Sequence, residues 1–147
     1  MSLTSWAKNG WLRTHQVTKE EIRNLFEIID RDIQDACVKG ISDDWKFGTA
    51  YNAALKLCTV LLHSEGYRPE KNLTHYRTLN ALPLILGAKY KDDADYLDTC
   101  RKKRNETEYD TAGNVSKEEA QELINYCREL KVEVLVWLKK HHSELLK

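Results

Sequence analysis

The sequence predicts an all-α fold, an antiparallel bundle of four to six helices. Three observations support this prediction. Apolar residues recur at helical spacing in several long segments, and capping residues precede most of these segments. Only 6 Gly and 2 Pro interrupt the chain. With 147 residues, a single domain over 1–147 is expected, with its core in about 17–140.

The first long helix is expected to begin after Thr18. Thr18 and Glu21 have the spacing of a capping box, in which each side chain binds the backbone N–H of the other residue. Apolar residues follow at helical spacing, and Gly40 is expected to stop the helix. Ser42 is the next N-cap, and it predicts a second helix near 43–65.

The middle of the chain carries weaker signals. A shorter apolar segment spans about 72–86, and Pro83 within it predicts a kink or an early stop. Asp92 or Asp93 is expected to open the next helix, because acidic residues favour the first turn.

The end of the chain predicts a long last helix near 116–141. Ser116 and Glu119 form a second capping-box pattern, and an apolar stripe follows. The N-terminal residues, which include Leu3 and Trp6, are consistent with one extra short helix. No segment alternates convincingly enough to predict a strand.

The charge balance limits the classes of partner. The chain has 23 basic and 23 acidic residues, so its formal net charge is zero and bulk attraction to nucleic acid is not expected. Any contact with nucleic acid must come from a local patch. Neither a signal peptide nor an apolar run of the ~18–20 residues needed to cross a bilayer is found. We therefore expect a cytoplasmic protein without membrane contact.

The cysteines predict neither disulfides nor a metal site. No two of them form a C-x-x-C pair, and no His lies at metal-ligand spacing from any of them. Each falls on an expected apolar helix face, so we expect unpaired thiols with at least three mostly buried. No metal and no cofactor are expected. The four are Cys37, Cys58, Cys100 and Cys127.

The segment 101–110 is the richest in chemistry. It begins with four consecutive cations that end at Arg104, and Asn105 follows. A guanidinium matches a phosphate with two parallel hydrogen bonds, and an amide adds a neutral donor and acceptor. Helical spacing places Arg104 in line with Leu97 and Cys100, which should face the core. The alternative is a solvated basic turn at a helix end.

Several landmarks together resemble the HEPN superfamily of small helical bundles, and most closely an uncharacterised bacterial branch of it. The resemblance covers about residues 17 to 140. It implies a metal-independent ribonuclease or an inactive relative, often a toxin paired with a minimal nucleotidyltransferase or a part of a defence system. The landmarks are Asp44 with Phe47, Ala50–Ala54, Gly66–Arg68, His75, Arg104 with Asn105, and Tyr109 with Asp110.

The functional signature of this family is an Arg, usually with a polar neighbour, and a His shortly after it. The resemblance assigns these positions to Arg104, Asn105 and Tyr109, so a phenol stands where the family has an imidazole. Active members pair two protomers around one cleft, which implies a homodimer here. To act as a base near pH 7, a phenol with an ordinary pKa of about 10 needs about 4 kcal/mol of specific stabilisation. The signature therefore favours binding over catalysis.

Other residues are candidates for the same site. Arg101 and Lys102 are expected to contact RNA or a nucleotide, and His75 and Tyr51 are placed beside them by the landmarks. For His75 a cap or core contact is the alternative, and for Tyr51 a packing role. The four tryptophans are interpreted as core or interface anchors. His15 and His63 have no nearby partner in sequence, and the pair His141–His142 is interpreted as solvated.

Three functions remain open from the sequence. The first is a non-catalytic or weakly active HEPN-like module that binds RNA, a nucleotide or a protein partner in a toxin–antitoxin or defence setting. The second is a metal-independent HEPN ribonuclease that uses Arg104, Asn105 and Tyr109. The third is a helical interaction protein in which these residues are structural.

Overall fold

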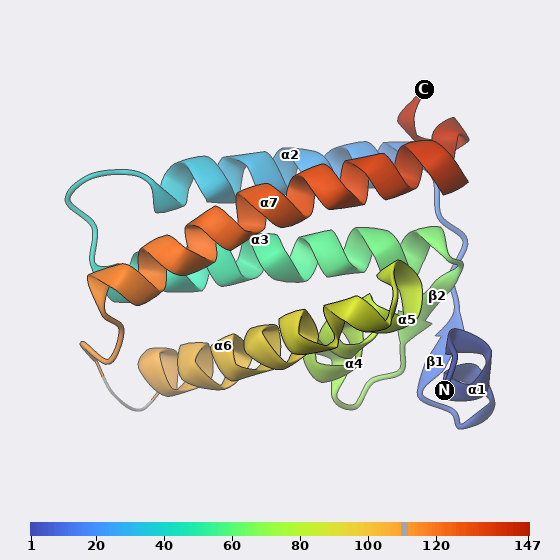
Figure 1. The fold of residues 1–147 in the computed structure, drawn as a ribbon, viewed down its shortest axis with the longest axis horizontal. Helices are drawn as coiled ribbons and strands as arrows, with labels where there is room; N and C mark the ends of the chain where they lie inside the picture. Colours follow the sequence, from blue (N-terminus) through green and yellow to red (C-terminus); the bar gives the residue numbers. More distant parts are fainter. Residues whose placement is uncertain (110–111) are drawn as a thin grey trace.

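The computed structural model describes residues 1–109 and 112–147; the side chains of Glu108 and Tyr109 are outside the described part. Among the described residues, four long helices form a bundle (Figure 1), which confirms the predicted fold class. Successive long helices run in opposite directions, so α3 and α7 point the same way. They are α2 (Lys19–Ala36), α3 (Asp43–Ser64), α6 (Lys91–Tyr109) and α7 (Lys117–His141).

Two of the predicted caps form as expected. At the start of α3, the Ser42 hydroxyl accepts a hydrogen bond from the Trp45 N–H at 3.0 Å. At the start of α7, Ser116 and Glu119 exchange both bonds of a capping box, at 3.0 and 2.9 Å. These bonds satisfy backbone donors that the first turn leaves unpaired, and this is why the sequence located both starts well.

The predicted capping box at Thr18 forms only in part. The Thr18 hydroxyl accepts from the Glu21 N–H at 3.1 Å. The Glu21 carboxylate does not return to Thr18, because it binds His15 and His63. The helix also ends at Ala36, four residues before the predicted stop at Gly40.

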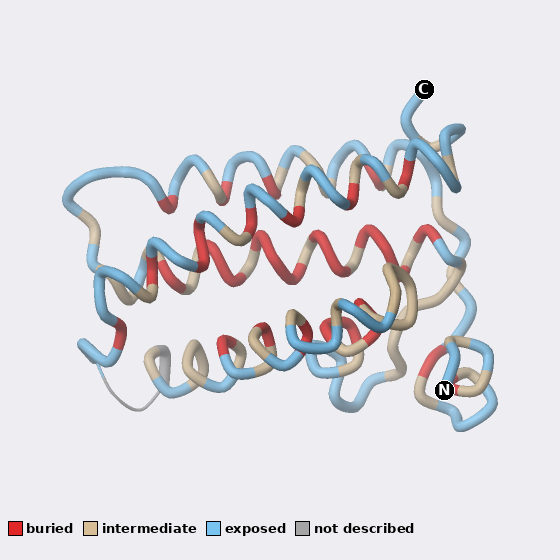
Figure 2. Tube along the Cα trace, in the orientation of Figure 1, coloured by how far each residue is buried: buried red, intermediate tan, exposed pale blue. Residues whose placement is uncertain are grey.

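The core surrounds α3, which is buried along most of its length (Figure 2). Helices α2 and α7 pack along it on one side, and α6 and α4 lie on the other (Figure 1). Tyr51 is among the largest fully buried side chains of this helix. A polar hydroxyl is therefore carried into the centre of the bundle, where a partner is needed.

The predicted segment around Pro83 divides into two short helices, α4 (Thr74–Asn80) and α5 (Leu82–Leu86). The break falls at Ala81, and Pro83 occupies the first turn of α5. Proline is tolerated there because its missing N–H would have no helical partner, so the predicted kink is confirmed. A short 3-10 helix, η1 (Ala88–Tyr90), leads into α6, and a second, η2 (Ser143–Leu146), ends the chain.

The N-terminal segment forms α1 (Leu3–Lys8), as predicted, and then a strand. β1 (Leu12–Thr14) pairs antiparallel with β2 (Tyr67–Pro69), which follows α3. The prediction of no strand was therefore wrong, since three residues are too few for alternation to be recognised. Gly66 makes the turn from α3 to β2 with a φ of 89°, a conformation that glycine adopts without strain.

All four cysteines are free, and Cys58, Cys100 and Cys127 are buried, as predicted. Cys37 is exposed, contrary to its assignment to an apolar helix face. It is the C-cap of α2 and lies beyond the last buried turn. None of the described helices has the length and apolar character of a membrane-spanning segment.

Candidate functional site

The basic run occupies the C-terminal half of α6. Arg101 Nε donates to Asp98 at 2.8 Å, and Lys102 Nζ lies 3.5 Å from the other oxygen of the same carboxylate. Lys103 pairs with Glu119 across to α7. Lys102 is largely exposed, whereas Arg101 is mostly covered. These carboxylates neutralise part of the run, so it does not present a continuous cationic face.

Arg104 lies on the inner side of α6, as the alignment with Leu97 and Cys100 predicted. Its guanidinium carbon is 5.7 Å from the centre of the Tyr51 ring, within the range of a cation–π contact. The ring of Tyr51 is fully buried. Contact with a fixed ring restrains the direction of the guanidinium, which favours a defined geometry toward a ligand.

The Tyr51 hydroxyl is 3.5 Å from His75 Nδ1. Three predicted site residues from α3, α4 and α6 are thus brought together around one ring, although 24 positions separate Tyr51 from His75 and 53 separate it from Arg104. His75 itself is exposed at the start of α4. The alternative of a core contact is present in this bond to the buried Tyr51, although His75 itself is not buried.

Burial and neighbouring cations set the charge states of this group. Burial raises the pKa of Tyr51 and outweighs the opposing effect of Arg101 and Arg104, so the phenol stays protonated. Burial also lowers the pKa of His75, and Arg104, Lys56 and Arg101 lower it further. His75 is therefore neutral at pH 7 and offers a nitrogen lone pair.

A pocket of about 390 Å³ lies beside Arg104, between the first turns of α3 and the end of α6. Trp45 is on its wall with 63% of its surface exposed. One Asp44 oxygen accepts the Gly113 N–H at 2.7 Å, and its other oxygen has no partner among the described residues. We call this cavity the Arg104 pocket. The lining residues used below are Asp44, Trp45, Thr49, Asn52, Arg104 and Thr107.

A larger hollow of about 660 Å³ lies between α6 and α7. Most of its charged lining consists of carboxylates, which repel a phosphate at neutral pH. Size alone would favour this hollow, but its charge argues for the Arg104 pocket as the site of an anionic ligand. The carboxylates are those of Asp92, Asp93, Glu118, Glu122 and Glu129.

The predicted signature is only partly described. Asn105 follows Arg104 on α6, but the described lining of the Arg104 pocket does not include it. The side chain of Tyr109 and all of Asp110 lie outside the described residues, so their predicted roles stay predictions.

Sequence reasoning missed two features at this end of the bundle. Trp45 was assigned to the core or an interface; its exposure beside Arg104 rules out the core, and the interface role stays a prediction. Its place in the first turn of α3, next to the apolar stripe and not within it, was the available signal. The Asp44 oxygen that has no partner among the described residues had no signal in the sequence.

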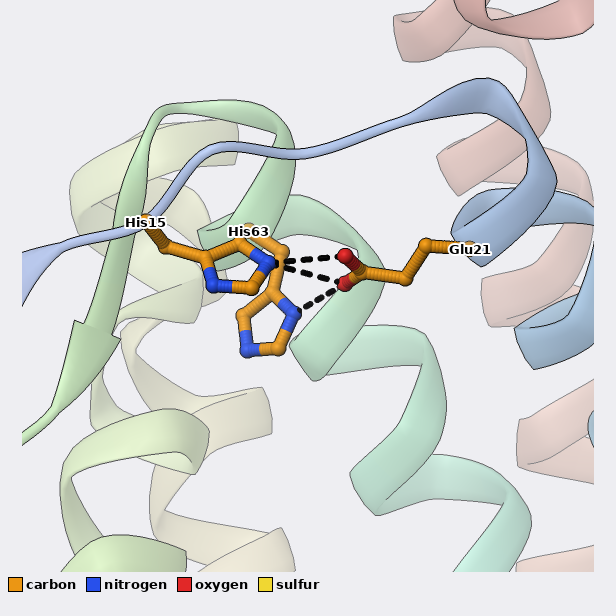
Figure 3. Close-up of side chains that lie close together, drawn as sticks. All are labelled: His15, Glu21 and His63. Atoms are coloured by element: carbon orange, nitrogen blue, oxygen red, sulfur yellow. Dashed lines mark hydrogen bonds and ion pairs between the residues drawn. The ribbon is translucent and has the colours of Figure 1, made fainter.

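Three histidines also have partners that sequence reasoning missed. His15 and His63 both bind Glu21 at the other end of α3 (Figure 3). His142, which was interpreted as solvated, lies 2.9 Å from Glu65. His63 is 42 residues from Glu21 and His142 is 77 residues from Glu65, so no local spacing marked these two pairs, whereas His15 is only six residues from Glu21.

The chain was compared with protein-family models, curated proteins and solved structures, and it matches none of them.

Proposed function

We propose that this protein is a HEPN-like module that binds RNA or a nucleotide at the Arg104 pocket and has little or no catalytic activity of its own. The observation that carries this proposal is the position of Arg104, held against the buried ring of Tyr51 while it lines a pocket with an exposed Trp45. A cation and an aromatic face side by side suit a ligand that contains both a phosphate and a base.

Each part of a nucleotide has a partner of fitting chemistry in this pocket. Arg104 provides charge-assisted donors for a phosphate, and Trp45 provides a face on which a base stacks. The Asn52 amide offers a donor and an acceptor.

The alternative function is a metal-independent ribonuclease, and His75 is the specific observation in its favour. It is exposed, neutral at pH 7 and within the electrostatic reach of Arg104. A neutral imidazole takes the proton of a 2′-hydroxyl, and the 2′-oxygen then attacks the adjacent phosphorus. The bond to the 5′-oxygen breaks and leaves a 2′,3′-cyclic phosphate. The 5′-oxygen takes a proton from water to become a hydroxyl, and the resulting hydroxide removes the proton from the imidazolium. In this reaction Arg104 stabilises the charge on the phosphate.

The test compares Arg104→Ala with Lys102→Ala. Single-stranded RNA binding is measured by fluorescence anisotropy, and melting temperature is measured on the same samples. Losing a charge-assisted contact of about 1.5–3 kcal/mol should weaken RNA binding by about 10- to 100-fold in Arg104→Ala. Lys102→Ala should have a smaller effect, since Lys102 is exposed and outside the pocket lining.

Two outcomes oppose the proposal. Unchanged RNA affinity in Arg104→Ala would refute a role of the pocket in RNA binding. A large fall in melting temperature with unchanged affinity would instead support the helical interaction protein, in which Arg104 is structural. Cleavage of RNA that vanishes in both Arg104→Ala and His75→Ala would favour the ribonuclease.

The proposal includes a homodimer and a toxin–antitoxin or defence setting, with a minimal nucleotidyltransferase as a partner. Light scattering tests the dimer, and a single species near the 17.1 kDa of one chain at micromolar concentration would contradict it. Toxicity on overexpression that disappears in Arg104→Ala would support a toxin. A gene for a minimal nucleotidyltransferase next to that of this chain would support the pairing.

A further inference from the structure

Three side chains from separate segments converge at the end of the bundle opposite the Arg104 pocket (Figures 1 and 3). His15 follows β1, Glu21 is in the first turn of α2, and His63 is in the last turn of α3. The two oxygens of Glu21 lie 2.8 and 3.1 Å from His15 Nε2, and one of them lies 2.5 Å from His63 Nδ1. We call this group the His15–Glu21–His63 cluster.

The backbone around the cluster is fixed independently of its side chains. The His15 N–H donates to the Gly66 carbonyl at 2.8 Å, in line with the β1–β2 pairing. The Glu21 N–H is bound by the Thr18 hydroxyl. The three side chains are 16 to 28% exposed, so they are largely covered but still accessible to water and ions. A site of this kind needs little rearrangement to accept a ligand.

We propose that the His15–Glu21–His63 cluster is a binding site for one divalent transition-metal ion, with Zn²⁺ the best fit. Two imidazole nitrogens and one carboxylate oxygen form a known ligand set for zinc, in which water takes the fourth position. One ligand atom from each of the three residues can be chosen so that all lie within 4.8 Å of one another. Ligands about 2.0–2.2 Å from a tetrahedral zinc are roughly 3.3–3.6 Å apart, so the two N···O pairs, now 2.8 and 2.5 Å apart, need only a small opening.

Proton positions are compatible with this proposal. Without metal, His15 Nε2–H and His63 Nδ1–H donate to the carboxylate. When an ion takes their place, each neutral ring carries its proton on the other nitrogen, and the facing lone pair binds the ion. Hydrogen bonds hold the three segments together without metal. When the ion is bound, its coordination bonds hold them together instead.

The charge states in the cluster favour ligands over protons. Burial lowers the pKa of His63 more than the hydrogen bond with Glu21 raises it. Burial raises the pKa of Glu21, but the hydrogen bonds from His63 and His15 outweigh it and leave the pKa below its ordinary value. At neutral pH the cluster thus offers a neutral imidazole of His63 and a carboxylate. Arg68, whose charge also lowers the pKa of His63, opposes a cation and limits the affinity.

The experiment titrates the untagged, reduced protein with Zn²⁺ in a calorimeter and with Co²⁺ in a spectrophotometer. One Zn²⁺ should bind per chain, and Co²⁺ should give the visible absorption of a low-coordinate N/O site. Glu21→Gln and His63→Ala should each weaken Zn²⁺ binding by more than about tenfold, since even indirect partners of a metal contribute that much. Zn²⁺ should also raise the melting temperature of the natural chain more than that of either variant.

Two matched controls separate this cluster from other metal-binding groups. His142→Gln alters a His–carboxylate pair at the same end of the bundle, with Glu65 at 2.9 Å, and should retain Zn²⁺ binding. Cys37→Ser removes the exposed thiol and should also retain it. Glu21→Gln keeps an amide that can bond both rings, so it reports on binding even where His63→Ala does not fold.

Three results would overturn the proposal. They are the absence of Zn²⁺ binding to the natural chain, Zn²⁺ binding unchanged in folded Glu21→Gln, and loss of binding in His142→Gln or Cys37→Ser. The first two would show that the cluster is a hydrogen-bonded tie between β1, α2 and α3 and nothing more. The third would place the ion elsewhere. RNA binding at the opposite end of the bundle is measured separately, so neither result depends on the other.

Discussion

The hydroxyl of Tyr51 lies 3.5 Å from Nδ1 of His75, and this contact joins the centre of α3 to the exposed start of α4. Tyr51 also places its ring 5.7 Å from the guanidinium carbon of Arg104. A fully buried residue thus contacts one exposed group, His75, and one half-buried group, Arg104. The precision of the candidate site rests on the packing of the core, because Tyr51 cannot move without disturbing α3.

The first prediction separates the ring of Tyr51 from its hydroxyl. Tyr51→Ala should lower the free energy of unfolding by about 3–5 kcal/mol, because it empties a large part of the core. Tyr51→Phe keeps the ring and loses one long hydrogen bond, so it should cost no more than about 1.5 kcal/mol. Urea unfolding followed by circular dichroism measures both. Equal losses in the two variants would contradict this view of the ring as the main support.

The second prediction concerns the pKa of His75. Arg104 contributes to its lowering and Lys102 does not, so Arg104→Gln should raise the pKa and Lys102→Gln should leave it unchanged. An NMR titration of the imidazole protons measures both variants. Because folding lowers this pKa, the unfolded chain binds the proton more tightly. The contribution of neutral His75 to the free energy of unfolding is therefore complete above the ordinary pKa of 6.5. It declines as the pH falls below that value. An unchanged pKa in Arg104→Gln would place Arg104 too far from His75 for the proposed site.

The sequence predicted the long helices well because their signals are local. Ser42 and Ser116 mark helix starts through bonds to residues three positions away, and sequence displays such spacing directly. The same locality placed Arg104 on the inner face of α6. It also explains the error at Glu21. The spacing of a capping box is present, but the Glu21 carboxylate binds His63, which is 42 positions away in the sequence.

The rest of the candidate site could not be read from sequence because tertiary packing creates it. Nothing near Trp45 indicates that Arg104 lies beside it, and the separation of the two along the chain hides the pocket. The β1–β2 pair was missed for the same reason, as each strand is too short to show its partner. These features depend on how helices meet, and the apolar stripes alone leave that arrangement open.

The third prediction concerns thiol reactivity. In the native protein, one of the four cysteines should react quickly with a thiol-specific disulfide reagent, and Cys37→Ser should abolish this fast phase. Burial raises the pKa of the other three thiols to about 12, so they are both covered and protonated. They should react only after denaturation. A second fast thiol in the native state would show that the core opens more readily than its packing implies.

The last prediction tests whether Trp45 stacks on a base. Its 63% exposed indole is beside Arg104, so bound RNA or nucleotide should quench its fluorescence. Trp45→Phe should lose most of this quenching while it keeps much of the affinity, because a phenyl ring still stacks. Trp45→Ala should lose about 1–3 kcal/mol of binding free energy, the usual contribution of one stacked base. Trp6 is buried in the packing of α1 against β1 and provides the matched comparison, because its fluorescence should not respond. If quenching persists in Trp45→Phe, the ligand contacts another tryptophan and the base is not held in the Arg104 pocket.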